Sequence, residues 1–387
     1  MPTKDFSPAI WAAGSKGMGS GPVPHTQGFR MPAEWEPHEA TWLAWPHNRD
    51  DWPGKIAAIY WVYAEIIRHI HQCEVIRVIV PDSSREKQAR RVLQRVGIEN
   101  FSQIEFHRLP TDRSWVRDSG PLFVVNKEEV AATCWRFSAW ARYPNWRKDD
   151  AVAEKIARRC GVEVWRPKYG ARRIVLEGGA VDVNGCGTVL TTEECLLGEQ
   201  QQRNPGMTRE DYEQAFRDYL GIRQVLWLGR GIAGDDTSGH IDDLARFVAP
   251  GTVITVVETD SRDANYKLLR DNLKRLKTMR DQDGHPLEIV ELPMPRPLTF
   301  DGCRLPASYA NFYIANGLVL VPTFNDPNDR IALDILARLF PRREVIGIHS
   351  IDFAWGFGTL HCSTQQQPAV GTRETAKQGG SAKEKKT

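Results

Sequence analysis

The chain has 387 residues, 41% of them hydrophobic, so it can bury a full core and, on length alone, form more than one domain. Its 51 basic and 49 acidic residues leave a net charge of +2, which gives no sign of a nucleic-acid or membrane-surface partner. Seven cysteines without a CxxC pair predict reduced thiols in a cytoplasmic protein rather than a disulfide framework.

Both ends of the chain differ in composition from its middle. Residues 1–28 lack the apolar core of a signal peptide and are predicted to be a flexible extension. Residues 369–387 are rich in Gly, Gln and Lys and have little to bury, so we expect a disordered tail. Residues 29–368 are expected to form a single domain, because one pattern recurs along them.

The recurring pattern is a helix followed by a strand. Apolar spacing predicts the first helix at 53–72, with Asp51 available to cap its start, and a strand at 73–81. The later helices are predicted at 83–97, 149–160, 208–220, 263–279 and 327–340. Their strands are predicted at 104–109, 162–167, 173–176, 224–229, 287–292 and 344–349. The helix starts recur about every sixty residues, a period typical of repeat architectures.

Hairpin turns complete each unit. They are predicted at Asn126-Lys127, Asn184-Gly185, Pro250-Gly251 and Asn316-Gly317, between β-rich runs. Each unit is therefore predicted to run strand, turn, strand, helix, strand, which is an α/β class of fold. The loops after the last strands are 110–121, 177–180, 230–243, 293–311 and 350–363. If the units are related by rotation about an axis, these loops meet at one end of it.

The loop at 350–363 contains the best candidate nucleophile, Cys362. It follows Gly356 and Gly358, which allow close backbone approach, and precedes a polar Ser-Thr-Gln run. A buried cysteine is more often inert packing, as we expect for Cys73, Cys134 and Cys160. The glycine-rich polar loop favours a catalytic role for Cys362.

The loop GDDTSGHIDD, residues 234–243, pairs His240 with Asp242. Residues two apart in an extended segment face the same way, so the imidazole and the carboxylate would meet one ligand. Two alternatives stay open, a histidine–aspartate pair with a purely structural role and a metal site that adds Asp235 or Asp236.

Two further carboxylates follow buried segments. Asp118 comes directly after Arg117, so a simple ion pair is possible, but nearby Trp115 offers an aromatic face for a planar cation. Glu177 follows the apolar run IVL and precedes two glycines. A carboxylate there requires a partner or a cationic ligand. Thiol, histidine and three acids together suit attack on a guanidinium carbon, whose nitrogens carboxylates can hold.

Several segments resemble the agmatine deiminase and bacterial peptidylarginine deiminase family. They are MPAEWEPHEATWLAWPH (31–47), WVRDSGP (115–121), LEGG (176–179), TTEECLL with RNPGM (191–207), GHIDDLARF (239–247), SYANFYIANG (308–317) and LHCSTQQQP (360–368). The resemblance implies the pentein fold, a five-bladed α/β propeller of pseudo-fivefold repeats, in one catalytic domain.

The resemblance also implies roles for individual residues. Cys362 would be the nucleophile and His240 the general acid and base, while Asp118, Glu177 and Asp242 would clamp the guanidinium. Substrate contacts are expected from Trp115, Asp236 and Asn311. No metal and no organic cofactor is expected, and a homodimer is possible because similar enzymes form dimers.

The expected reaction is hydrolysis of agmatine to N-carbamoylputrescine and ammonia through a covalent thiouronium. Two departures from the family pattern bear on the substrate: GDDTSGH lacks the usual glutamate, and Phe357 replaces the middle glycine of a triplet, where it would narrow the pocket. The alternatives are deimination of arginine or peptidylarginine, amidino transfer to an amine, and a non-catalytic guanidino-binding protein. The acidic residues Asp235, Asp236 and Asp243 favour a substrate with a distal cation over one with a carboxylate.

Overall fold

A computed structural model describes residues 21–370 of the chain. Most of the predicted extension and tail therefore lies outside the described residues. Within residues 21–28 the chain forms the short 3-10 helix η1 (Pro24–Gln27), and Pro24 is buried. No helix in residues 21–370 combines the length and apolar character needed to cross a bilayer.

Five α/β units follow one another along the chain, and each has its own sheet. The first unit contains β1 (His38–Ala44), α1 (Ile56–Ile70), β2 (Val75–Val80), α2 (Ser83–Arg95) and β3 (Ile104–Arg108). The second contains β4 (Leu122–Val125), β5 (Val130–Thr133), α4 (Val152–Cys160) and β6 (Glu163–Trp165). The third contains β9 (Asp182–Val183), β10 (Thr188–Thr192), α6 (Arg209–Leu220) and β11 (Gln224–Leu228).

The last two units repeat the same order of elements. The fourth contains β12 (Ala245–Ala249), β13 (Thr252–Val257), α7 (Asn265–Thr278) and β14 (Glu288–Pro293). The fifth contains β17 (Tyr313–Ile314), β18 (Leu318–Thr323), α8 (Asn328–Leu339) and β19 (Glu344–His349). In these two units, as in the second and third, a hairpin pairs the first two strands antiparallel, and a helix leads to a third, parallel strand. This order follows the predicted one.

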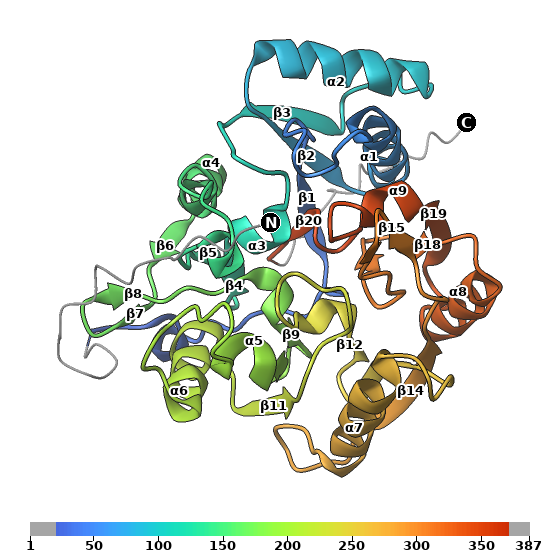
Figure 1. The fold of residues 1–387 in the computed structure, drawn as a ribbon. Coiled ribbons are helices and arrows are strands. Elements are labelled where there is room, and N and C mark those ends of the chain that lie inside the picture. Colours follow the sequence, from blue (N-terminus) through green and yellow to red (C-terminus); the bar gives the residue numbers. More distant parts are fainter. Residues whose placement is uncertain (1–20, 371–387) are drawn as a thin grey trace, which may run out of the picture.

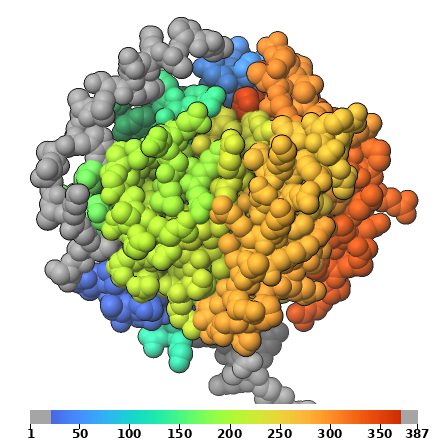
Figure 2. Space-filling view, turned by 60° about the horizontal axis from the view of Figure 1, so that its bottom comes forward, coloured from blue at the N-terminus to red at the C-terminus, as the bar shows by residue number. Residues whose placement is uncertain are grey.

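The chain closes on itself at its last strand. β20 (Thr364–Pro368) pairs antiparallel with β1, so the first sheet has the order β20-β1-β2-β3. The five sheets remain separate among the described residues, and no single closed sheet forms. Figure 1 shows the units following one another around the centre of the molecule, from blue through green and yellow to red. In Figure 2 the green and orange surfaces of the third and fourth units lie side by side.

The predicted helices are confirmed to within a few residues, as are the four hairpin turns. The strand predicted at 173–176 is wrong, since β8 covers only Arg172–Arg173. Beyond it Val175 forms only an isolated parallel bridge with Arg136, and its N–H is donated to the Asn204 side chain. The predicted helix cap is also wrong, because α1 begins after Lys55 without a side-chain cap and Asp51 binds Arg113 instead.

Short elements lie between and inside the units. The helical ones are α3 (Val116–Ser119), α5 (Glu193–Leu197), α9 (Ile351–Ala354), η2 (Ala139–Ala141), η3 (Asp149–Ala151), η4 (Gly178–Ala180) and η5 (Ile241–Asp243). Two small ribbons pair β7 (Lys168–Tyr169) with β8 and β15 (Thr299–Phe300) with β16 (Cys303–Arg304). Three of the short helices, α3, η4 and η5, carry acids of the predicted site or immediately follow one.

A buried charge network joins the units. Arg246 on β12 is fully buried and forms ion pairs with Asp182 of the third unit and with Glu34, 3.0 Å from its Oε1. Arg117 on α3 lies 3.2 Å from Glu34 Oε2. The same Arg246 guanidinium donates to the carbonyl oxygen of Phe312, at 2.9 Å. Since buried charges are costly unless paired, these contacts fix how the units meet.

Replacing Arg246 tests this network. Arg246→Met would leave Asp182 and Glu34 buried beside each other without their shared cation, so we expect the free energy of unfolding to fall by about 3–5 kcal/mol. Denaturant titration measures this. Arg262→Met, which breaks the exposed ion pair with Asp260, is the control and should leave the midpoint unchanged. Equal stability of the two variants would contradict a stabilising role for the network.

Candidate active site

Four of the five predicted loops contribute to one cavity of about 860 Å³. Cys362, Trp115, Asp118 and Asp236 lie on its wall. Two further segments complete the wall, one before α1 and one around η2. The rest of the wall includes Asp50, Asp51, Arg113, Trp140, Arg142, Tyr143, Asp301, Cys303, Trp355 and Phe357.

Cys362 lies at the floor of this cavity, in the turn that leads into β20. Its side chain is largely buried. The Asn311 amide donates to Sγ at 3.1 Å, and Asp242 Oδ2 lies 3.6 Å from Sγ. Burial raises the pKa of the Cys362 thiol well above its usual range, and the charges of Asp242 and Asp243 raise it further. The thiol therefore stays protonated unless a cation offsets these carboxylates.

Asp118 is held at the cavity wall by two hydrogen bonds. The Trp140 indole donates to Oδ2 at 2.9 Å, and the Gly179 N–H donates to Oδ1 at 2.9 Å. Burial raises the pKa of Asp118. Trp115, on the same wall, packs its ring against that of Phe353, with centroids 5.9 Å apart. The carboxylate is thus oriented beside an aromatic surface.

His240 is buried among three carboxylates. Its Nδ1 is 3.8 Å from Asp118 Oδ1 and 4.0 Å from Asp242 Oδ1, and its Nε2 is 3.8 Å from Glu177 Oε2. Neither ring nitrogen has a hydrogen-bond partner among the described residues. Burial alone would lower the pKa of His240, but Asp118, Cys195 and Glu177 raise it well above its usual range. The ring is therefore set to carry a proton.

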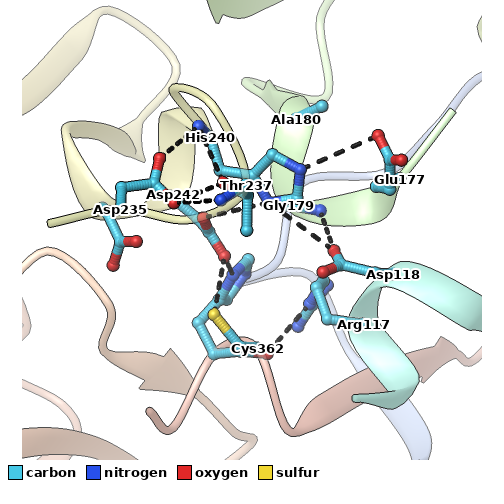
Figure 3. A network of polar contacts seen from close by, with 12 residues as sticks. Arg117, Asp118, Glu177, Gly179, Ala180, Asp235, Thr237, His240, Asp242 and Cys362 are labelled. Carbon is cyan, nitrogen blue, oxygen red and sulfur yellow. Dashed lines mark hydrogen bonds and ion pairs between the residues drawn. The ribbon is translucent and has the colours of Figure 1, made fainter. Parts of the chain in front are cut away.

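The backbone around His240 is fixed by Asp235. Its carboxylate accepts hydrogen bonds from the N–H groups of Thr237, Gly239 and His240, at 2.7 to 3.1 Å. This turn presents the imidazole toward Asp118 and Glu177 (Figure 3). Asp235 therefore stabilises the backbone of the loop, and it is absent from the cavity wall.

Asp242 is oriented by a histidine that directly precedes Cys362 in the sequence. His361 Nδ1 lies 2.7 Å from Asp242 Oδ2, and His361 Nε2 lies 2.8 Å from Glu34 Oε2. Burial would raise the pKa of Asp242, but His361 lowers it overall. Asp242 Oδ1 has no hydrogen-bond partner among the described residues. Figure 3 shows Asp242 and Asp118 on neighbouring sides of Cys362.

Glu177 differs from its predicted role as a clamp. Like Asp242 and His240 it is absent from the cavity wall, but unlike them it forms an ion pair with an arginine, Arg203, whose Nε lies 3.2 Å from Oε1. Burial would raise the pKa of Glu177, but Arg203 and His240 lower it overall. The carboxylate faces Nε2 of His240, the ring nitrogen that points away from Asp118 and Asp242. Arg203 and His240 together balance its negative charge.

Two other expectations differ from the structure. Asn311 is fully buried and absent from the cavity wall, because its amide groups bind Cys362, Asp243 and Thr359. Of the three acids in loop 235–243 that were expected to face a distal cation, only Asp236 lines the cavity. Asp243 is buried against Asn311, and its pKa is raised well above the usual range by burial and then by Asp242.

The alternative metal set is not brought together. Among residues 21–370, His240 groups with Glu177 and Cys195, whose ligand atoms all lie within 4.8 Å, and neither Asp235 nor Asp236 belongs to this group. Asp236 instead accepts a hydrogen bond from the Tyr143 hydroxyl at 2.6 Å. Arg203 already supplies the positive charge beside Glu177.

Sequence reasoning missed Glu34, Arg203 and His361. Each lies in a segment that carried the family resemblance, MPAEWEPH, RNPGM and LHCSTQQQP, but nothing in those segments says which side chains meet. Phe357 does lie on the cavity wall, as its position in the same loop as Cys362 suggested. Its backbone has a φ of +64°, a conformation that is rare for a large side chain.

Comparison with known proteins bears on this arrangement. The family model for Porphyromonas-type peptidyl-arginine deiminase matches residues 30–368. The chain belongs to this family. The agmatine deiminase of Pseudomonas aeruginosa (strain LESB58) is 36% identical over 372 residues, which cover 90% of this chain and 97% of that protein.

Solved structures of family members have the same fold. The agmatine deiminase of Enterococcus faecalis, described as catalysing its reaction, superposes with a TM-score of 0.84 at 35% identity, covering 92% of this chain and 100% of that one. A cysteine-to-serine variant of the C. jejuni agmatine deiminase with substrate bound superposes with a TM-score of 0.77 at 29% identity. The match covers 88% of this chain and 96% of that one. The mixed α/β fold of this chain is thus that of the deiminase family.

Gly179 offers a direct test of the site. A Cβ added there would lie 2.5 Å from His240 Nδ1, 2.9 Å from Asp118 Oδ1 and 3.0 Å from Asp242 Oδ2, so Gly179→Ala must displace at least one of them. We expect deiminase turnover to fall by about 100-fold, the usual effect of a misplacement near 1 Å. Ammonia release measures the rate.

Gly251→Ala is the matched control, because an added Cβ meets nothing within 4 Å in that hairpin turn. Its turnover should equal that of the wild type. Full activity of Gly179→Ala would show that the three side chains do not need their present spacing.

Proposed function

We propose that this chain is an agmatine deiminase that hydrolyses agmatine to N-carbamoylputrescine and ammonia. The observation that carries the proposal is that Cys362 and Asp118 line one cavity, with the buried Asp242 and His240 in close contact with them. The agmatine deiminases among its relatives support agmatine as the substrate.

The architecture we propose is a five-bladed α/β propeller in a single catalytic domain over residues 29–368. Five separate sheets, four of them with the same hairpin, helix and parallel strand, support five blades. Pairing of β20 with β1 lets the last residues complete the first blade. The match of the family model over residues 30–368 supports one domain.

Substrate binding begins with Asp118 and Asp242, which we assign as the guanidinium clamp. Planar guanidinium nitrogens form charge-assisted hydrogen bonds with carboxylate oxygens, and Asp242 Oδ1 has no other partner. The bound cation offsets the carboxylates that hold the Cys362 pKa high, so the thiol loses its proton to solvent and becomes a nucleophile.

The thiolate then attacks the guanidinium carbon, forming a C–S bond. His240 gives its proton to a terminal nitrogen, the C–N bond breaks, and ammonia leaves a covalent thiouronium. Water, deprotonated by His240, attacks the same carbon, and the C–S bond breaks to regenerate the thiolate with a ureido product. Glu177 faces His240 Nε2 at 3.8 Å and favours the protonated ring that the first step requires.

The charges of the cavity wall favour a cationic substrate. Five aspartates, at positions 50, 51, 118, 236 and 301, line it together with two arginines, Arg113 and Arg142. Both arginines are near an aspartate, Arg113 paired with Asp51 and Arg142 3.9 Å from Asp236, so acidic groups remain in excess.

The remaining parts of the proposal concern the setting of the enzyme. All seven cysteines are free, which supports a reducing, cytoplasmic location. A homodimer is proposed by analogy with similar enzymes. Deimination of arginine or peptidylarginine is the second candidate, and the two wall arginines are the observation that favours it.

Replacing the nucleophile tests the chemistry. Cys362→Ala should abolish ammonia release from agmatine while the thermal unfolding midpoint stays close to that of the wild type, because the side chain is small and lies at a cavity floor. Cys186→Ala, at an exposed thiol, is the control and should keep full turnover. A folded Cys362→Ala protein that still releases ammonia would remove the covalent mechanism.

A substrate comparison tests specificity. We expect kcat/KM for agmatine to exceed that for free arginine by about tenfold or more, because a substrate carboxylate would face the excess of acids on the wall, and tenfold corresponds to about 1.4 kcal/mol. Arginyl peptides belong in the same ammonia-release assay. Better turnover of arginine or of a peptide would shift the substrate assignment and leave the deiminase chemistry standing.

A further inference from the structure

The short helix η2 has a backbone conformation that its sequence does not favour. Ala139, Trp140 and Ala141 have φ angles of +48°, +58° and +52°, so three consecutive residues with side chains lie in the left-handed region. Residues other than glycine seldom adopt this conformation, and then singly, because Cβ comes too close to the following carbonyl oxygen. The turn therefore costs free energy that other contacts must offset.

Hydrogen bonds on the far side of the cavity hold this turn in place. Gln201, whose own φ is +50°, donates its side-chain amide to the carbonyl oxygens of Trp140 and Asp236, both at 2.9 Å. The Tyr143 hydroxyl donates to Asp236 Oδ2 at 2.6 Å. Asp236 belongs to the loop that carries His240, so the turn is tied to one of the loops of the candidate site.

The turn places the Trp140 indole against Asp118. Nε1 donates to Asp118 Oδ2 at 2.9 Å, and the Trp140 ring packs edge-on against Phe137, with centroids 5.2 Å apart. Gly179 donates its N–H to the other oxygen, Oδ1, also at 2.9 Å. Two donors from different segments thus fix the plane of the carboxylate. A carboxylate has about four lone pairs, so each oxygen keeps one for a guanidinium.

A second tryptophan shows that packing alone does not require such a backbone. Trp135 is as buried as Trp140, with 4% of each residue exposed, and its indole donates to Thr133 Oγ1 at 3.0 Å. Trp135 packs against Phe216 and Tyr219, is absent from the cavity wall and has no left-handed φ. Backbone strain that persists beside a site indicates that the site depends on it.

We propose that Trp140 is a positioning residue that holds the Asp118 carboxylate in the orientation in which it binds the guanidinium group, and that the left-handed turn of residues 139–141 is retained for this purpose. The inference rests on the proposed deiminase function. The indole N–H acts on the substrate only through Asp118. Because Asp118 holds the guanidinium before and during the reaction, loss of its orientation should weaken binding as well as slow turnover.

The experiment measures binding separately from turnover. Trp140→Phe removes the indole donor and keeps an aromatic ring in its place, and the Cys362→Ala background prevents the reaction. In calorimetric titration with agmatine we expect Trp140→Phe to raise the Kd by about tenfold, the usual effect of losing one hydrogen bond to a charged group. In the enzyme that retains Cys362, kcat/KM for agmatine should fall by at least the same factor.

Trp135→Phe is the matched control, since it removes an indole hydrogen bond of similar length from an equally buried tryptophan. Its Kd and kcat/KM should equal those of the protein with both tryptophans intact, at a temperature where every variant is folded. Equal affinity of Trp140→Phe and Trp135→Phe for agmatine would overturn the role of Trp140. A wild-type enzyme that releases no ammonia from agmatine or any other guanidine would instead overturn the proposed function.

If Trp140→Phe does not fold, the turn itself provides a second test. Ala141 is exposed, so a larger side chain there displaces no buried group. Ala141→Val places a β-branched residue where φ is positive and should reshape the turn and weaken agmatine binding, although Trp140 is unchanged. Ala141→Gly suits that φ and should keep the original Kd. Equal Kd values for the valine and glycine variants would overturn the role of the turn.

Discussion

Pairing of charge inside a closed core is the constraint on which this molecule depends. Glu34, ahead of the first strand, receives Arg117, Arg246 and His361 from three other parts of the chain. None of these groups reaches water to an appreciable extent, so each needs the others to be tolerated in the interior. These contacts hold separate units together next to the candidate site. They therefore also fix the positions of Asp118 and Cys362, which directly follow Arg117 and His361 in the sequence.

The placement of charge also governs the reactivity of Cys362. Carboxylates close to Cys362 keep its proton in place, so the thiol stays unreactive toward electrophiles until a positive ligand offsets their charge. His361 connects the candidate site to the buried charge network. One of its ring nitrogens contacts Asp242 beside Cys362, and the other contacts Glu34. The position of Asp242 and the packing of the units are thereby coupled through one side chain.

Local patterns predicted much of this fold, because helix periodicity and turn chemistry are properties of neighbouring residues. The helices and hairpins, and the loops that carry Cys362, His240, Asp118 and Asp242, followed from them. Contacts between residues far apart in the sequence did not follow from local patterns. Glu177 meets Arg203, Asn311 lies behind Cys362, and Asp51 meets Arg113 instead of capping a helix, and each outcome depends on which loops converge. Such contacts are set by tertiary structure, and a single sequence contains no periodic signal for them.

Pairing of β20 with β1 has a consequence for how each newly synthesised chain folds. The strand that completes the first sheet directly follows Cys362 and comes after every element of the five units, so the first unit is synthesised well before its final partner. Contacts between such distant segments raise the contact order of the chain and slow folding. Cys362 is therefore enclosed only after all five units have been synthesised, and a chain interrupted before them lacks both a finished first sheet and this thiol.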